Sequence, residues 1–320
     1  MFPTGPVAVT FMGTTVLDRI LEIEEFPKPN DTSVVTSCTM QFGGRAAAPA
    51  ATFAALGGRA RLLSVVGSDF ASSGFDKFLS DSGVDISLVA READDECYMT
   101  NTYIEARSRE TFTYFEPRAL GQSVSPENMD ALRKAEALYI AGYYSHEGLS
   151  MAAEASLAAK VPLALGLCNG IVPYASRDLM RALIKSAHVV AFNNSEWKII
   201  VQKLGLTREA DLFEMADSLE CIYHTRGGET GSGFLRDGRE FEIPIRKVEE
   251  CVSTVGAGDT FMAGFLYGRM LGLDYVDSAR TGSLLASMKV ETSLGATFPI
   301  KHKATLEERL SVLLREAGIT

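Results

Sequence analysis

The chain has 320 residues, of which 46% are hydrophobic and 22% are charged, a composition typical of globular proteins and unlike that of disordered or membrane-embedded ones. Its net charge of −10 argues against nucleic acid or an anionic membrane as a partner, because both need clustered Lys and Arg. Five dispersed cysteines without a C-x-x-C pair, four scattered histidines and the lack of a membrane-length apolar run predict a reduced, cytoplasmic protein without a disulfide framework or zinc site.

Short apolar segments rich in β-branched residues alternate with longer segments of helical periodicity. This alternation predicts an α/β fold with a mostly parallel sheet and helices on its faces. The expected strands are Val7–Met12, Arg61–Val66, Ala137–Ile140, Pro162–Leu167, His188–Phe192, Cys221–Thr225 and Gly233–Leu235. The expected helices are Arg45–Leu56, Phe75–Ser82, Pro126–Lys134, Ser150–Ala159, Arg177–Ser186 and Ser195–Leu204, followed from Ala257 by further helices that end with Thr305–Ala317.

Two segments have strand composition without a helix between their strands. They are Asp31–Phe42 and Cys97–Phe115, and the second is expected to form a hairpin that turns around Ala106–Glu110. We expect a small sheet that projects from the core, although extra edge strands of the main sheet would explain the same pattern. An apolar face with Val34, Tyr103 and Phe115 on such a sheet could pair two copies of the chain as a homodimer.

The stretch CVSTVGAGDTF, residues 251–261, places small residues directly before a lone carboxylate. Gly256, Ala257 and Gly258 precede the amphipathic run Asp259–Leu271, so their backbone amides are expected at a helix N-terminus, where unpaired donors and the helix dipole favour an anion. Asp259 would then lie in the first helical turn. The simpler interpretation is that Asp259 only caps the helix, which is worth about 1 kcal/mol.

The longer stretch STVGAGDTFMAGF resembles the D-T-x-G-A-G-D-x-F signature of the ribokinase-like (PfkB) carbohydrate kinase family. Other parts of the chain match the family in order: Gly13 and Asp18, Gly43-Gly44, VVGSDFASSGF, Ser82–Asp85, Asn193 with Glu196, and Thr225-Arg-Gly227. The chain thus resembles the family over almost its whole length, and we treat it as a single ribokinase-like domain, 1–320, with lid segments at about 18–42 and 97–117. The resemblance implies a three-layer α/β/α core with a small β-sheet lid.

The resemblance also implies a phosphotransferase that moves the γ-phosphoryl group of Mg–ATP to a primary hydroxyl. Asp259 would be the base that accepts the hydroxyl proton, and Gly256, Ala257 and Gly258 would form the anion hole. Asn193 and Glu196 would organise Mg²⁺ and the nucleotide phosphates, with Glu196 acting on the metal largely through water. An N-cap Asn with a capping-box Glu has nearly the same pattern.

Thr225 and Gly227 resemble the T-x-G turn that meets ATP, although Gly231 comes one residue later than in the usual T-x-G-x-x-G. No G-x-x-x-x-G-K-[ST] phosphate loop is present in the sequence, and no G-x-G-x-x-G follows the first strand. The pattern therefore argues against a Walker-type or dinucleotide-binding fold.

For the acceptor, the resemblance implies hydroxyl binding by Asp18 and close backbone approach at Gly43 and Gly44. Two departures matter. Ala48 stands where the family usually has an acceptor-binding Asn, so Arg45 could instead supply a cation or a fork of donors, which would suit an acidic or unusual acceptor. Ser253 replaces an Asp that often helps to bind a potassium-like ion, and Val255 replaces a common Thr, which argues against activation by a monovalent cation.

Two interpretations of the acceptor and one non-catalytic interpretation of the protein stay open. The stretches at Tyr139–Tyr144, Leu165–Val172 and Gly295–Pro299 look most like the adenosine kinase branch, which favours a nucleoside such as adenosine. TTVLDRILEIEEFP and the missing Asn favour a sugar or sugar-acid kinase of the same family. A non-catalytic regulator that binds a metabolite or nucleotide is the third alternative, against which the intact Asp259 argues.

Overall fold

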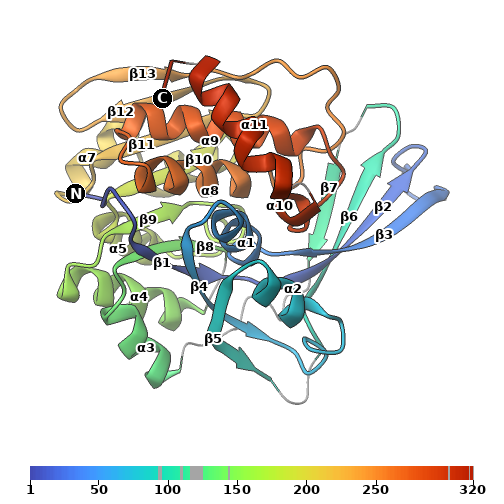
Figure 1. Cartoon of the computed structure of the whole chain (residues 1–320), viewed down its shortest axis with the longest axis horizontal. Helices are drawn as coiled ribbons and strands as arrows, with labels where there is room; N and C mark the ends of the chain where they lie inside the picture. The colour runs from blue at the N-terminus through green and yellow to red at the C-terminus, as the bar shows by residue number, and fades with distance from the viewer. Residues whose placement is uncertain are drawn as a thin grey trace.

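The computed structural model describes residues 1–92, 96–108, 111–115, 125–142, 145–301, 303–316 and 318–319. Figure 1 shows a large sheet between two layers of helices and a second, small sheet that projects to one side. The predicted α/β class and the separate small sheet are both confirmed. The predicted lid segment 116–117 and Tyr143–Tyr144 lie outside the described residues.

Nine strands of the described chain form the large sheet. Its order is β13 (Glu240–Ile243), β12 (Glu229–Leu235), β11 (Cys221–Arg226), β10 (Val189–Asn193), β9 (Leu163–Gly166), β8 (Ala137–Ala141), β1 (Ala8–Gly13), β4 (Arg59–Val66) and β5 (Val84–Arg91). The run from β11 to β5 is parallel, and β12 and β13 continue it antiparallel. Because parallel strands align their carboxyl ends, residues that follow β1, β8 and β10 meet at one edge.

The helices divide between the two faces of this sheet. One face carries α1 (Ala47–Ala55), α2 (Phe75–Asp81), α8 (Ala257–Met270), α9 (Tyr275–Val290), α10 (Phe298–Lys301) and α11 (Lys303–Glu316). The other face carries α3 (Pro126–Arg133), α4 (His146–Ala159), α5 (Arg177–Ser186), α6 (Asn194–Leu204) and α7 (Leu212–Met215). Among the described helices, none combines the length and the apolar character needed to cross a membrane.

Alternation along the inner strands explains the two layers of core. In β1, Phe11 belongs to the apolar cluster under α1 and α8, whereas its neighbour Met12 belongs to the cluster on the α4 and α5 side. Tyr139 and Ile140 of β8 divide in the same way. Successive side chains of a strand point to opposite faces, so these apolar runs supply both cores.

The small sheet has the strand order β3 (Val35–Gly43), β2 (Val16–Ile23), β6 (Met99–Glu105) and β7 (Thr111–Phe115). The predicted hairpin is confirmed, since β6 pairs antiparallel with β7. Sequence patterns did not predict β2, nor did they predict β5 and β13 of the large sheet. Charged residues interrupt the apolar pattern of β2, because one face of this strand meets solvent or a cavity rather than a core.

The helix α8 differs from its prediction as an amphipathic helix, because every residue from Asp259 to Arg269 is buried. Its neighbour α9 packs very close, since a Cβ at Gly264 would lie 2.8 Å from the Cα of Gly282 and one at Gly268 would lie 2.8 Å from the Cα of Ser278. Larger side chains at these glycines would separate the two helices. The N-terminus of α8 is therefore held rigidly against the core.

Candidate active site

The turn before α8 presents unpaired backbone amides. Gly256 is the N-cap residue and has φ of +78°, a left-handed conformation that favours glycine, and its helix has no side-chain cap. The amide of Ala257 donates to the Thr254 carbonyl at 3.1 Å, whereas within the described chain the amides of Gly256, Gly258 and Asp259 have no acceptor. A Cβ at Gly258 would meet no atom within 4 Å, so open space adjoins these donors.

Asp259 lies in the first turn of α8, where its carboxylate faces Arg45 rather than capping the helix. Its side chain is 12% exposed, and its Oδ1 lies 3.5 Å from Nη1 of Arg45, whose side chain is 41% exposed. Burial raises the pKa of Asp259, while the charges of Arg45 and Lys289 oppose that rise. The nearby carboxylate in turn raises the pKa of Arg45, which therefore stays cationic.

A cavity of about 70 Å³ brings six of the predicted site residues together across four segments of the fold. Its walls include Arg45, Asn193, Glu196, Thr225, Gly258 and Asp259. Residues of β8 and β9 form the floor of this cavity. A Cβ at Gly166 would lie 3.0 Å from the Tyr139 hydroxyl, so glycine at this position leaves room for that hydroxyl. Two of the predicted catalytic residues (Gly258 and Asp259), three of the predicted nucleotide-binding residues (Asn193, Glu196 and Thr225) and Arg45 therefore line one hollow, whereas Gly256, Ala257 and Gly227 are not among its lining residues.

Asn193 and Glu196 form a capping box at the start of α6. The Asn193 Oδ1 accepts hydrogen bonds from the amides of Ser195 and Glu196, and the Glu196 Oε2 accepts one from the Asn193 amide at 2.7 Å. The Glu196 Oε1 accepts a further bond from the amide of Asn169 at 3.1 Å. The predicted N-cap Asn with a capping-box Glu is thus confirmed. Each carboxylate oxygen of Glu196 already accepts one backbone amide, so only its remaining lone pairs are left for a ligand.

Thr225 and Gly227 lie at the end of β11 and in the turn that follows it. The Thr225 hydroxyl donates to the Phe192 carbonyl at 3.3 Å, and Gly227 has φ of +64° in open space, where a Cβ would meet no atom within 4 Å. By contrast, a Cβ at Gly231 would lie 2.9 Å from the His224 carbonyl oxygen. Gly231 thus serves the packing of β12 against β11, and the open turn is at Gly227.

The position of the Asp18 carboxylate depends on two glycines at the end of β3, Gly43 within the strand and Gly44 directly after it. A Cβ at Gly43 would collide with the Asp18 Oδ2, so only glycine at this position leaves room for the carboxylate. Gly44 has φ of +115° and lies against Thr14 and Thr15. Burial raises the pKa of Asp18 to about 6, with a smaller rise from Asp259, while the hydrogen bond from Thr100 and the charge of Arg45 oppose it.

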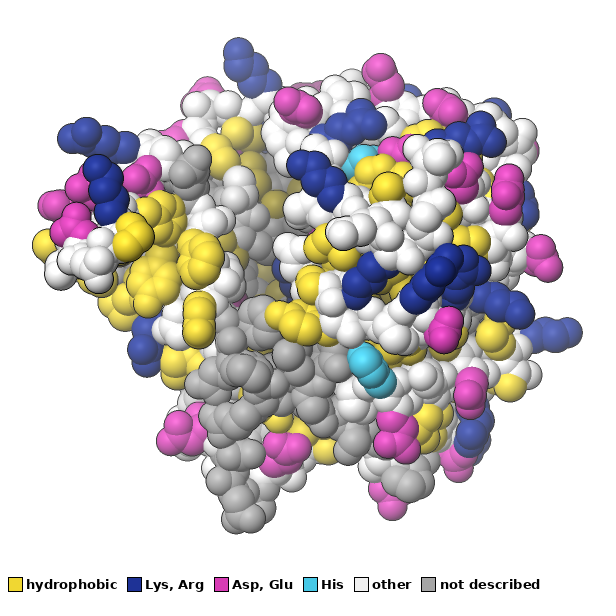
Figure 2. Space-filling model, turned by 180° about the vertical axis from the view of Figure 1, so that it is seen from behind, with side chains coloured by type: hydrophobic (Ala, Val, Ile, Leu, Met, Phe, Trp, Pro, Cys, Tyr) yellow, Lys and Arg dark blue, Asp and Glu magenta, His cyan; other side chains and the backbone are white. Residues whose placement is uncertain are grey.

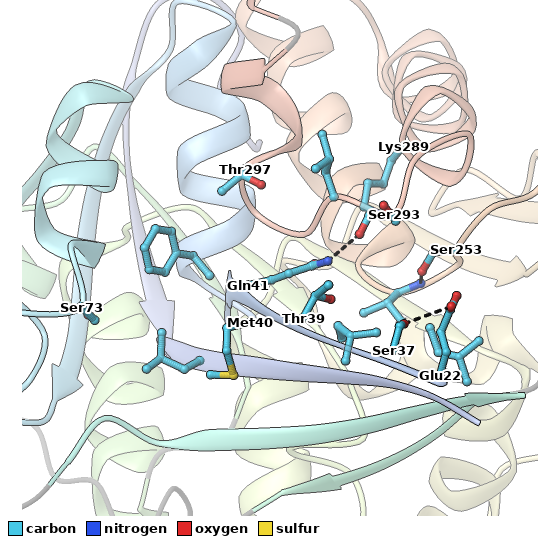
Figure 3. A pocket seen from close by; sticks show the side chains of 16 residues that line it. Glu22, Ser37, Thr39, Met40, Gln41, Ser73, Ser253, Lys289, Ser293 and Thr297 are labelled. Carbon is cyan, nitrogen blue, oxygen red and sulfur yellow. Dashed lines mark hydrogen bonds between the residues drawn. The ribbon is translucent and has the colours of Figure 1, made fainter. Parts of the chain in front are cut away.

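A larger cavity of about 780 Å³ lies between the small sheet and the segment that joins α9 to α10. In Figure 3, Gln41 crosses this space to donate a hydrogen bond to the Ser293 carbonyl at 2.7 Å, and Lys289 lies on the same side as Ser253. Both apolar and polar side chains form the walls, which include Ile20, Glu22, Thr39, Gln41, Phe42 and Leu294. None of the predicted site residues lines it, although Asp18 shares a sheet face with Ile20 and Glu22.

The residues that sequence analysis missed in this cavity follow from strand register. Asp18 pairs with Gln41, Ile20 with Thr39 and Glu22 with Ser37, so these six positions share one face of the small sheet. A prediction of β2 would have placed Glu22 on the face of Asp18 by its period of two. Lys289 had another signal, since it is the single charge within the otherwise uncharged and mostly apolar stretch LLASMKV.

The donor set limits how a metal ion could be held. Within the described residues, no three His, Cys, Asp or Glu side chains gather in a metal-binding cluster. Mg²⁺ commonly keeps several waters and binds through one or two carboxylates plus substrate phosphates. Glu196, which is 5% exposed and already accepts two amide bonds, fits such a contact through water rather than a protein-only metal site.

The comparisons with known proteins identify the family. A family model described as pfkB family carbohydrate kinase matches residues 8–303, so the chain belongs to this family and is a phosphotransferase that acts on a hydroxyl group. The chain is 27% identical over 287 residues to a nucleoside kinase of Methanocaldococcus jannaschii, a match that covers 88% of this chain and 90% of that protein. The predicted family and class of reaction are confirmed.

Solved structures confirm the ribokinase-like fold. A Burkholderia thailandensis nucleoside kinase in complex with inosine has a TM-score of 0.80 at 23% identity and covers 95% of this chain and 98% of its own. An Arabidopsis thaliana ribokinase complexed with ribose and ATP has a TM-score of 0.77 at 19% identity, with 95% and 99% covered. At these identities the likeness concerns the fold.

The Arg45–Asp259 pair predicts a shift that titration can measure. Replacing Arg45 with Met removes the positive charge that favours the carboxylate, so the pKa of Asp259 should rise further above its ordinary value. Arg45→Lys should keep most of the effect. Carboxyl-carbon NMR of Asp-labelled protein checks both variants, and an Asp259 pKa that is the same in wild type and Arg45→Met would contradict the pairing.

Proposed function

We propose that this protein is an ATP-dependent kinase that transfers the γ-phosphoryl group of Mg–ATP to a primary hydroxyl, with a nucleoside as the favoured acceptor. One observation carries the proposal: the buried carboxylate of Asp259 lies beside Arg45 and beside backbone amides that have no acceptor among the described residues. Phosphoryl transfer needs an oriented oxygen nucleophile together with donors aimed at the charge on the transferred group. This turn of the chain offers both.

Asp259 would accept the proton of the acceptor hydroxyl as that oxygen attacks the γ-phosphorus. The oxygen–phosphorus bond to the nucleotide then breaks, and ADP leaves with the bonding electrons. The amides of Gly256 and Gly258 would hold the equatorial oxygens of the transferred group. Ala257 would contribute mainly its small side chain, because its own amide already donates to Thr254.

Arg45 would face the transferred phosphoryl group from the side of the small cavity. Its guanidinium is partly exposed and lies next to Asp259, Asn193 and Glu196 in the same hollow. A planar fork of donors suits phosphate oxygens. Its pairing with Asp259 also weakens the argument for an acidic acceptor, since the charge of Arg45 is already matched by a carboxylate.

Asn193, Glu196, Thr225 and Gly227 would bind the nucleotide and its metal. Mg²⁺, when bound, would neutralise charge on the β- and γ-phosphates, and Glu196 would orient it through water. The open turn at Gly227 leaves room for the nucleotide, and the fixed capping box keeps Glu196 in one rotamer. ATP as the donor also favours the cytoplasm as the place of action.

The larger cavity would hold the acceptor under the small sheet, which would act as a lid. A volume of about 780 Å³ exceeds what a single pentose requires and lies within the range of pockets for drug-sized molecules, which suits a nucleoside. Asp18 at its edge would bind ribose hydroxyls, with Gly43 and Gly44 allowing close approach, and the wall formed by Phe42, Ile20 and Leu294 would meet the base. Closure would exclude water from the reaction.

The direct test is turnover with Mg–ATP and a panel of nucleosides, pentoses, hexoses and sugar acids. We expect phosphorylation of at least one nucleoside with a higher kcat/KM than any sugar. Turnover of sugars alone would leave the kinase chemistry intact and replace the nucleoside acceptor. Binding of a panel member without turnover, under conditions where ATP also binds, would favour a regulator.

Asp259→Asn separates chemistry from binding. The amide keeps the size of the side chain and cannot accept the proton, so kcat should fall on the order of 10²–10⁴-fold. The Kd of ATP, measured by calorimetry, should stay close to that of wild type. Asp277→Asn, a change in the partly exposed first turn of α9, is the matched control and should retain full turnover. Wild-type turnover in Asp259→Asn would remove this residue from its proposed role.

The outer face of the small sheet suggests a contact between two copies of the whole 320-residue unit. Hydrophobic side chains gather over this sheet at the left of Figure 2, and Phe112 and Tyr114 are 57% and 64% exposed. We propose that a second copy covers this face, with Val34 and Tyr103 beside it. Of the apolar face predicted from the sequence, the Phe115 side chain lies outside the described residues.

Sedimentation of the wild type and of a Phe112→Asp variant tests this contact. The wild type should sediment as a dimer, and the variant should shift to monomer because the new charge would be buried in the interface. Monomeric wild type across micromolar concentrations would rule the contact out.

A further inference from the structure

Lys289 is a buried cation that the proposed chemistry has not yet used. It lies in the last turn of α9 and is 2% exposed. Within the described chain its ammonium has neither a hydrogen bond nor an ion pair, although it reaches the wall of the larger cavity. A buried charge without a partner is costly to the fold, so such a residue is expected to serve a ligand.

Backbone pairing places this lysine next to the turn that precedes α8. The amides of Val252 and Ser253 donate to the Val290 carbonyl at 2.7 and 3.2 Å, which ties the two segments together. A Cβ at Gly256 would lie 3.8 Å from the Lys289 Cε, so the lysine stem passes directly beside the N-cap residue. Figure 3 shows Lys289 and Ser253 at the same end of the cavity.

The charges around Lys289 leave its ammonium available to an anion. Burial lowers the pKa of Lys289 to about 8, while Cys251 and Asp259 raise it by smaller amounts. The next carboxylate along α9, Glu291, is already paired with Arg246 at 3.0 Å and with Arg309. Among the described residues, only Asp259 therefore provides a carboxylate that acts on this ammonium, and it also faces Arg45.

We infer that Lys289 is a positioning residue for phosphoryl transfer, whose fixed positive charge stabilises Asp259 and the anion held at the N-terminus of α8. The inference rests on the proposed kinase function and adds a residue to it. Arg45 lies 3.5 Å from the carboxylate and the stem of Lys289 passes beside Gly256, so two cations lie near the turn where negative charge would accumulate. In a water-poor site such fixed charges act strongly, because they need no reorganisation during the reaction.

The neutral residue at 253 is consistent with this arrangement. Ser253 lines the cavity with Lys289, and its hydroxyl accepts a hydrogen bond from the Val255 amide at 3.3 Å. A carboxylate at this position would pair with Lys289 and divert its charge from the turn. Because residue 253 is a neutral serine, the charge of Lys289 remains available to the proposed anion site. The lysine would thereby supply positive charge there without a bound metal cation.

Kinetics of three variants test the inference, with Lys185→Met as the matched control because Lys185 is an exposed lysine in the last turn of α5. Lys289→Met should lower kcat about 10²-fold, with the KM of ATP and of the acceptor changed less than about threefold. Lys289→Arg should recover most of the loss. Millimolar methylammonium should raise kcat of Lys289→Ala several-fold and leave wild type and Lys185→Met unchanged.

The pH profile adds a measurement that a merely structural lysine would not change. The ammonium is charged below its pKa, so wild-type kcat/KM should fall as the pH rises through about 8. In Lys289→Arg this basic limb should move to higher pH, and in Lys289→Met it should disappear. Thermal unfolding should show a Tm of Lys289→Met equal to or above that of wild type, because an uncompensated buried charge has been removed.

Binding of orthovanadate in the presence of Mg–ADP tests the anion contact without turnover. Lys289→Met should raise the Kd of vanadate at least about tenfold and leave the Kd of Mg–ADP unchanged, since vanadate resembles the transferred group. An unchanged vanadate Kd, or a Lys289→Met variant that keeps wild-type kcat, would overturn the role of Lys289. Lack of turnover in the wild type would instead refute the proposed function, and the vanadate result would still decide the anion contact.

Discussion

The burial of a carboxylate at the start of a helix is the constraint on which the rest of this site depends. Asp259 lies where water is scarce and where desolvation alone raises its pKa and favours its protonated form. Arg45 opposes that tendency from 3.5 Å, and the unpaired amides of the turn add positive potential at the N-terminus of α8. The carboxylate can therefore remain an acceptor for a proton while the surrounding charge favours an incoming anion.

The fold supplies the rigidity that this balance requires. The glycines at 264, 268 and 282 bring α8 and α9 into backbone contact, so the first turn of α8 cannot move away from the cations beside it. The parallel strands β10 and β11 deliver Asn193 and Thr225 to this edge, and the chain that leaves β3 of the small sheet brings Arg45 to the same cavity. The small sheet adds the wall of the larger cavity, and its link from Gln41 to Ser293 connects it with the segment after α9.

Sequence patterns predicted most of the scaffold because apolar periodicity follows directly from burial. Except for β5, the strands of the parallel sheet have largely apolar runs, and the helices between them were predicted within a few residues. The helix α4 begins earlier than predicted, at His146, because the Ser145 hydroxyl caps it. Patterns failed at β2, where Asp18 and Glu22 face a cavity and break the expected alternation.

The turn at Gly256 was recognisable from three small residues before an acid. Which of its amides lack an acceptor was not recognisable, because the hydrogen bond from Ala257 to Thr254 depends on local geometry. Lys289 was missed for a related reason: its partner would be a ligand, and no sequence period marks such a contact.

A crystal structure with Mg–ADP, fluoroaluminate and the preferred acceptor would test the central claim most directly. We expect fluoroaluminate to accept hydrogen bonds from the amides of Gly256 and Gly258, with the acceptor hydroxyl between it and the Asp259 carboxylate. Fluoroaluminate bound away from this turn, or an Asp259 carboxylate directed away from the acceptor hydroxyl, would contradict that claim.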